Sequence, residues 1–219
     1  MQSFIKIPYS LIYNRAMGDK RVLAYSSIIF SRWAGDNIEN LVQYSGFCAR
    51  RDSGGVLQQY KVLTQELIEN NYFKISNSGL MHITKDERYG IIYFSEFKLI
   101  LHSREREVAG GGRRINHSHL LLLLAHIRLC MIRKHGLPQF YSNLLIRISE
   151  SIGLSVRTIS KCLKILEELN IIHSEELPRY KDNKGCWHSN VKIFVNMASH
   201  NWQAETSRGI RYILASQIE

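Results

Sequence analysis

The chain has 219 residues, of which 45% are hydrophobic and 22% charged, and it carries a formal net charge of +10. This composition excludes a disordered chain and a fibrous protein, and it leaves room for one large hydrophobic core or two small ones. The excess of positive charge favours a polyanionic partner, such as nucleic acid or an acidic membrane surface.

Neither a membrane span nor a secretory signal is expected. The longest apolar run, residues 120–125, falls far short of the roughly 20 apolar residues that cross a bilayer. The N-terminal residues lack a basic stretch followed by an apolar run and a small-residue cleavage site. The cysteines are scattered, which predicts reduced thiols and a cytoplasmic protein. No membrane partner is expected. These cysteines are Cys48, Cys130, Cys162 and Cys186.

The first elements in chain order are two helices, a turn, a third helix and a hairpin. Residues 19–34 have the pattern of an apolar helix, and residues 39–47 that of a short helix stopped by a glycine. A longer helix then ends at Asn71, and residues 72–84 alternate around an Asn-Ser-Gly turn, as in a β-hairpin. Residues 89–103 add a further strand and a short helix to this unit.

The same order of elements recurs later in the chain. Residues 116–136 predict an apolar helix, residues 144–154 a short helix, and the residues after Ser155 a longer amphipathic helix. Residues 171–196 then give two strand-like runs around a polar loop. The second unit therefore repeats the plan of the first.

The helix ends in the two units also correspond. Residues 66–73 can be laid over residues 165–172, and in each segment an amphipathic helix runs into an asparagine, Asn71 or Asn170. Asparagine tolerates the left-handed conformation at a helix C-terminus, and the apolar pair that follows it suits a strand. Gly153 is expected to stop the short helix of the second unit.

A linker separates the two units. Residues 104–114 combine a charge run with three glycines and lack apolar periodicity. The sequence therefore predicts an α+β, predominantly helical protein with two winged-helix domains in tandem, each a helix-turn-helix followed by a β-hairpin. The predicted divisions are an N-terminal domain (1–103), the linker (104–114), a C-terminal domain (115–197) and a tail with a short helix (198–219).

The helix after Ser155 is the candidate DNA-reading element. In a helix-turn-helix, two helices are joined by a short turn, and the second helix enters the major groove. Four apolar residues should pack against the 116–136 helix, namely Ile159, Leu163, Leu166 and Leu169. Their spacing leaves the N-cap and the polar residues outward, and these are Ser155, Arg157, Thr158, Ser160, Lys161 and Lys164.

Among these residues, we expect Arg157 and Lys161 to be the main readers of the DNA sequence. An arginine can pair bidentately with a guanine edge, whereas serine, threonine and lysine more often hold phosphates. The alternative for each cation taken alone is a solvated helix face.

The hairpin of the second unit would form a basic wing over the adjacent DNA backbone or minor groove. Its polar loop contains Pro178 and Gly185, and its cations are Arg179, Lys181 and Lys184. In the N-terminal unit, further candidates for DNA contact are Arg50, Arg51, Gln58 and Lys61. A surface loop, or use of the N-terminal unit for dimerisation, is the alternative there.

The order of elements up to about residue 196 resembles that of tandem winged-helix proteins. The opening FIKIPYSLI, followed by GDKRVLAYSSIIFSRW, is similar to the start of the winged-helix domain in plasmid and phage replication initiators of Gram-positive bacteria. The segment SVRTISKCLKILEELNII has a pattern shared with transcriptional regulators. The resemblance implies binding of double-stranded DNA by a protein of a mobile element, acting as a replication initiator or transcriptional regulator, with homodimer formation as a possibility.

Catalytic and metal chemistry lack their sequence signals. Ser118 separates His117 from His119 where the metal site of rolling-circle nucleases has a hydrophobic residue, and no Cys-x-x-Cys or His-x-x-x-His zinc pattern is present. The phosphate-binding loops GxxxxGK[ST] and GxGxxG are also missing from the sequence. We therefore expect no enzyme activity, no cofactor and no metal.

Two alternatives remain open at this point. The chain could be a non-catalytic protein-interaction module, a winged-helix scaffold or inhibitor whose basic surface binds an acidic protein. The 116–136 helix is apolar nearly all round, which favours a buried central helix of the second unit and leaves a dimer interface as the alternative.

Overall fold

Helices and short antiparallel sheets make up the described chain, which confirms the predicted α+β class. The computed structural model describes residues 4–34, 55–76, 79–83, 88–102, 116–131 and 140–195. Several predictions fall outside these residues and stay predictions: the linker 104–114, the tail 198–219, Arg50 and Arg51.

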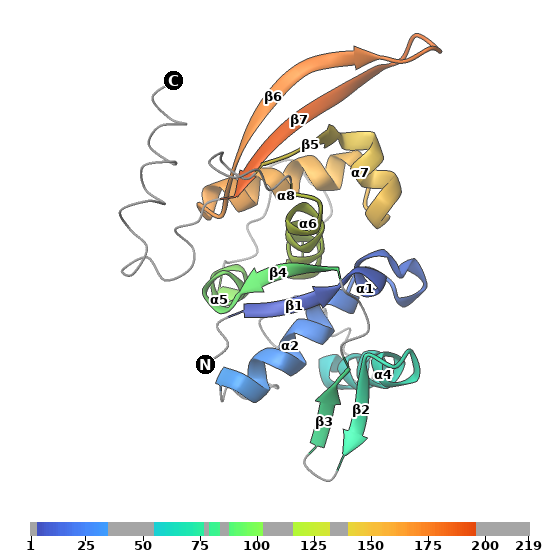
Figure 1. Ribbon diagram of the computed structural model, residues 1–219, viewed down its shortest axis with the longest axis vertical. Helices are drawn as coiled ribbons and strands as arrows, with labels where there is room; N and C mark the ends of the chain where they lie inside the picture. Colours follow the sequence, from blue (N-terminus) through green and yellow to red (C-terminus); the bar gives the residue numbers. More distant parts are fainter. Residues whose placement is uncertain are drawn as a thin grey trace.

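The first half of the described chain, residues 4–102, has two antiparallel strand pairs packed with helices (Figure 1). Its elements are β1 (Phe4–Pro8), α1 (Tyr9–Tyr13), the 3-10 helix η1 (Arg15–Met17), α2 (Arg21–Ala34), α4 (Gly55–Glu69), β2 (Phe73–Ser76), β3 (Gly79–His82), β4 (Tyr89–Tyr93) and α5 (Phe94–His102). Strand β1 pairs with β4, and β2 pairs with β3 as the predicted hairpin. The strand and short helix expected over residues 89–103 are β4 and α5.

The second half, residues 116–195, has one sheet of three antiparallel strands on three helices. Its elements are α6 (His117–Cys130), β5 (Phe140–Leu144), α7 (Leu145–Ile152), α8 (Val156–Glu168), β6 (Ile172–Lys181) and β7 (Trp187–Val195). Strand β7 lies in the centre, with β5 on one side and β6 on the other. Beyond the reach of β5, the β6–β7 hairpin projects away from the body (Figure 1).

The turns form where the sequence predicts them. Asn71 and Asn170 have φ angles of 58° and 56°, which is the left-handed conformation expected after α4 and α8. Gly153 caps α7 with a φ of 80°, a conformation that most other residues adopt only at a cost. The two helix ends and the turn before α8 are therefore confirmed.

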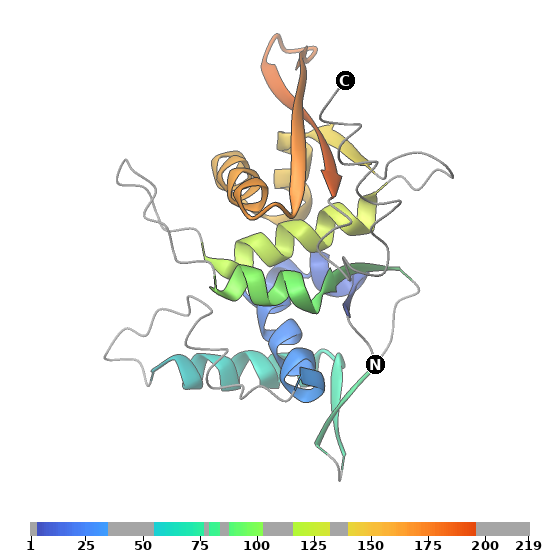
Figure 2. The same ribbon diagram turned by 90° about the vertical axis from the view of Figure 1, so that its left-hand side faces the viewer.

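Helix α6 lies between the two halves and is buried nearly all round. It packs against β4 and α2 on one side and against α8 on the other, and one continuous core runs through both halves (Figure 2). Leu121 and Leu123, on different sides of α6, have no exposed surface. The apolar helix is thus central to the whole described chain rather than to the second unit alone. Its apolar surface is covered by its own chain, so the dimer interface considered for this helix is wrong.

Strand β4 approaches the backbone of α6 at a single glycine. A Cβ atom built on Gly90 would lie 2.2 Å from the carbonyl oxygen of Ala125, well inside van der Waals contact. Only glycine therefore permits this spacing between strand and helix.

A buried chain of hydrogen bonds joins the halves through His126 of α6. The Nδ1 atom of His126 lies 2.9 Å from the hydroxyl of Tyr13 in α1, and its Nε2 atom lies 2.9 Å from the hydroxyl of Tyr141 in β5. Burial lowers the pKa of His126 to about 4. The imidazole is therefore neutral at pH 7, with one nitrogen donating and the other accepting.

A buried ion pair fastens α6 two residues beyond His126, near the same C-terminal end. Arg128 donates to the Oε1 atom of Glu96 in α5, and its guanidinium lies 4.7 Å from the ring centre of Tyr93. The Oε2 atom of Glu96 accepts from the Tyr93 N–H at 2.9 Å, which caps the start of α5. Both charges are buried, so removing either partner would leave an uncompensated charge in the core.

Replacing Gly90 by alanine should destabilise the whole described fold. The added methyl group meets backbone that cannot rotate away, and we expect a loss of at least about 2 kcal/mol. Urea unfolding would measure the shift in midpoint. Gly185→Ala is the control, because the nearest atom to its Cβ lies 3.8 Å away and its φ of 82° adds only local strain. Equal losses in the two variants would contradict the close approach of β4 to α6.

Stability should fall as the pH drops from 6.5 towards 4. In this window the unfolded chain protonates His126 and the folded chain does not, so acid favours unfolding. Lowering the pKa from 6.5 to about 4 corresponds to about 3 kcal/mol. His126→Gln keeps a donor and an acceptor but does not titrate, so its unfolding midpoint should vary less over the same window. An identical pH dependence in the two proteins would contradict a neutral buried His126.

Candidate nucleic-acid interface

Helix α8 is fixed to the body by one apolar face. Ile159, Cys162 and Leu166 on this face are fully buried, and Leu163 is nearly so. The face packs against α6, as predicted, and against α7. Leu169 is only half-buried because the helix ends before it and Leu169 is the C-cap residue.

The opposite face of α8 carries a stripe of cations. Arg157 and Lys164 are exposed and Lys161 is half-buried. Their spacing of four and then three residues places them one above the other on the helix. Among the residues that the structure describes, none has a side-chain hydrogen bond, ion pair or ring contact with the side chain of any of these three cations. Their charges are therefore available to a ligand.

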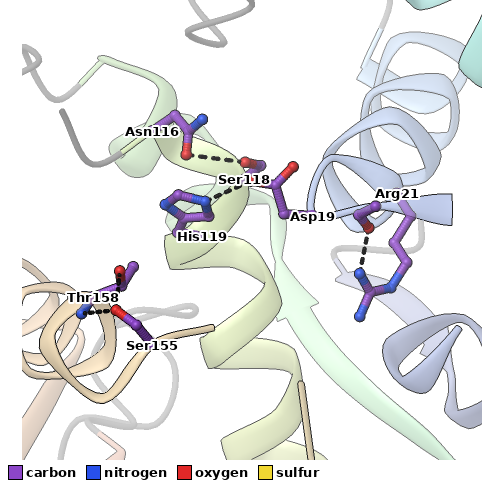
Figure 3. A network of polar contacts seen from close by, with 8 residues as sticks. Asp19, Arg21, Asn116, Ser118, His119, Ser155 and Thr158 are labelled. Carbon is purple, nitrogen blue, oxygen red and sulfur yellow. Dashed lines mark hydrogen bonds and ion pairs between the residues drawn. The ribbon is translucent and has the colours of Figure 1, made fainter. Parts of the chain in front are cut away.

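The hydroxyl residues of α8 hydrogen-bond within the helix. The Oγ atom of Ser155 accepts from the Thr158 N–H at 3.1 Å and lies 2.8 Å from the Thr158 Oγ1 atom (Figure 3). Ser160 donates to the carbonyl of Val156 at 3.0 Å. Ser155 is thus confirmed as the N-cap, and these three hydroxyls are hydrogen-bonded within the first turns of the helix.

The hairpin places three predicted cations in solvent but has a shorter loop than expected. Arg179, Lys181 and Lys184 are exposed. The predicted polar loop contained Pro178, whereas in the structure β6 runs through Pro178 and continues to Lys181. From Leu177 to Tyr180, β6 advances three residues while its partner β7 advances only two, so β6 contains a β-bulge. Pro178 has no backbone N–H to donate to the sheet, and the bulge accommodates it so that the strand continues.

One carboxylate organises the tip of the hairpin. The Oδ1 atom of Asp182 accepts from the N–H groups of Lys184 and Cys186 at 2.9 and 2.8 Å. Its Oδ2 atom lies 2.8 Å from the Nε2 atom of His188, and this hydrogen bond is the main cause that lowers the pKa of Asp182. Gly185 supplies the left-handed turn with a φ of 82°. The cation Lys184 is therefore carried on an ordered turn.

A groove of about 330 Å³ runs between α8 and the hairpin. Lys164 and Arg179 line it, together with the acidic side chain of Glu176. Glu167, also in the groove, accepts from the N–H and the hydroxyl of Ser174 at 2.6 and 2.7 Å and so ties α8 to β6. Its Oε1 atom is thereby satisfied within the protein, and the helix and hairpin form one surface.

The candidate residues of the N-terminal unit lie elsewhere. Gln58 and Lys61 are exposed on α4, and α4 lies at the opposite end of the molecule from α8 in both views (Figures 1 and 2). The structure therefore does not bring these two residues together with the cations of α8. Arg50 and Arg51 lie outside the described residues.

The structure adds residues that the sequence analysis missed. Arg15 of η1 is exposed, and its side chain lies 3.6 Å from the position of a Cβ atom on Gly153, in the turn that leads into α8. No local pattern could find Arg15, because the contact joins the two halves. Tyr180 and Trp187 near the hairpin tip are also exposed, and they stood in the sequence as aromatic residues next to the basic loop.

His119, at the start of α6, has a structural role. The Nε2 atom of His119 lies 2.5 Å from the Oδ2 atom of Asp19, and this hydrogen bond lowers the pKa of the Asp19 carboxyl (Figure 3). The contact adds a polar link between the halves. Among the described residues, no three or more His, Cys, Asp or Glu side chains form a group that could hold a metal ion.

Replacing Ser155 by alanine should destabilise the protein by about 1 kcal/mol, because the N–H of Thr158 loses its acceptor. Thermal or urea unfolding would measure the change. Ser151→Ala is a matched control, since its hydroxyl donates to the Arg147 carbonyl within a helix and caps nothing. A loss for Ser155→Ala no larger than that for Ser151→Ala would contradict the cap.

Comparison with known proteins does not give a function for this chain, so the function must be inferred from the geometry of α8 and the hairpin. No described helix has the length and apolar character needed to cross a membrane. No protein-family model, curated protein or solved structure matches the chain. What the protein binds must therefore be inferred from its own residues.

Proposed function

We propose that this chain is a duplex DNA-binding protein of winged-helix architecture, which reads sequence with α8 and holds the backbone with the β6–β7 hairpin. Its role would be replication initiation or transcriptional regulation on a mobile element. The order α6, β5, α7, α8, β6, β7 and the antiparallel sheet β5-β7-β6 support this architecture. A helix-turn-helix presents its second helix to the major groove, and here that helix is α8.

The observation that carries the proposal is the stripe of Arg157, Lys161 and Lys164, in which Arg157 and Lys164 are exposed and Lys161 is half-buried. Their helix is backed by fully buried residues, so the side chains extend from a rigid element. Arg157 lies in the first turn of α8, the part of a recognition helix that contacts base edges. We assign Arg157 and Lys161 to base reading and Lys164 to phosphate contact.

The wing adds contacts that depend on charge more than on sequence. Arg179, Lys181 and Lys184 extend the basic surface from the groove to the hairpin tip. Residues 140–195 contain eight Lys or Arg residues against six Asp or Glu residues. The attraction for DNA must therefore arise from these local cations rather than from a uniformly basic domain.

The first half repeats the order of a helix followed by a hairpin in α4, β2 and β3, which supports a tandem arrangement. Gln58 and Lys61 would then contact DNA at a place separate from α8. Selection of bound fragments from randomised duplex would separate the two cellular roles. Repeated direct sites would favour a replication initiator, and one inverted repeat would favour a regulator that binds as a homodimer.

Substitutions on α8 and on the wing should affect DNA binding differently. Arg157→Ala should reduce the preference for a selected site over random duplex by about tenfold, because a bidentate base contact is lost. Lys184→Ala should weaken binding to all sequences alike and lower the slope of log affinity against log salt by about 1, because one phosphate contact is lost. Fluorescence anisotropy over a salt series measures both quantities.

Lys98→Ala is the charge-matched control, since Lys98 is exposed on α5 rather than on α8 or the hairpin, and it should change neither quantity. Failure of the wild-type chain to bind any duplex at low salt would overturn the proposal. That result would favour the protein-interaction module, for which an acidic protein replaces the nucleic acid.

A further inference from the structure

Two large aromatic side chains are exposed near the tip of the projecting hairpin. Trp187 is 64% exposed and Tyr180 is 50% exposed. Three exposed cations lie in the same stretch of the hairpin, namely Arg179, Lys181 and Lys184. Exposed aromatic rings beside cations form the combination that holds unpaired nucleic acid, because a base stacks on the ring while the cations attract the phosphates.

Trp187 lies on the face of the hairpin that continues towards α8. Side chains alternate along a strand, so Trp187 shares a face with Val191 and Ile193, which are buried in the core. Ser174, paired with Ile193 on this face, hydrogen-bonds Glu167 of α8. The extra residue of the bulge lies in β6 and leaves the alternation of β7 intact.

One side of the indole is already covered by a cation. The Nζ atom of Lys181 lies 5.6 Å from the ring centre of Trp187, and the two residues are partners across the hairpin. The indole is nevertheless largely exposed, which leaves ring surface for a ligand. The turn that Asp182 orders connects Lys181 to Trp187. Because this turn is already ordered, little ordering of the hairpin tip is required when the indole binds a ligand.

A base pair inside a duplex cannot stack on the indole of Trp187, because both faces of the base pair are covered by neighbouring base pairs. A stacking contact needs a base whose face has been opened. We propose that Trp187 stacks on an unpaired base, so that the preferred ligand is duplex DNA with unpaired bases beside the segment bound by α8. This inference rests on the proposed duplex binding and adds the class of DNA structure that the protein prefers.

The test compares three labelled DNAs of one sequence: a full duplex, the same duplex with a short internal bubble, and the single strand. Wild-type protein should bind the bubble about tenfold more tightly than the full duplex, since one stacked base contributes on that scale. Trp187→Ala should abolish this preference without changing the affinity for full duplex. Trp187→Phe should keep most of the preference, and Leu99→Ala, which truncates an exposed apolar residue of α5, should keep all of it.

The outcomes separate this inference from the proposed function. Equal binding of bubble and duplex, or a bubble preference unchanged in Trp187→Ala, overturns the stacking contact and leaves duplex binding in place. Binding to none of the three DNAs overturns both. Binding to bubble and single strand but not to full duplex overturns the duplex proposal, and sensitivity to Trp187→Ala then still supports the stacking contact.

Discussion

The structure depends on the burial of α6 between the two halves of the described chain. The helix contributes leucines to a core that runs through both halves, and its backbone meets β4 where Gly90 removes the side chain. His126 of α6 hydrogen-bonds to Tyr13 and Arg128 pairs with Glu96, and these contacts fix two sides of the helix. His126 also hydrogen-bonds to Tyr141, which connects the helix to the sheet of the second half. Most side chains of α6 are buried against neighbouring elements, so the helix is held firmly in place. It therefore acts as the frame on which α8 is mounted.

This frame determines which face of α8 is exposed. The side that packs against α6 and α7 cannot turn outward without opening the core, so Arg157, Lys161 and Lys164 stay on the solvent side. The hydrogen bonds between Ser174 and Glu167 then hold the hairpin against the same helix. The proposed interface is therefore a rigid combination of helix and hairpin. A rigid surface of this kind suits recognition by side chains, because little ordering is required on binding.

Local signals in the sequence predicted the local structure well. Ser155, Gly153 and Asn170 act through their own backbone and near neighbours, so their roles follow from residue type and spacing. The sharing of α6 between both halves could not be predicted, since the packing partners of a helix apolar all round are set by the whole fold. Contacts across the halves, such as Arg15 beside the turn at Gly153, are hidden for the same reason. The length of β6 was not predicted, because a proline such as Pro178 usually ends a strand, whereas here it is accommodated at a β-bulge.

The most direct measurement is photocrosslinking to duplex DNA from defined positions on the surface. Benzoylphenylalanine in place of Lys164 lies on the proposed contact face of α8, while the same amino acid in place of Leu99 lies on α5, outside that face. The account predicts a DNA adduct from position 164 that is lost at high salt, and none from position 99. An adduct from position 99 with none from position 164 would contradict the assignment of α8 as the DNA-reading element.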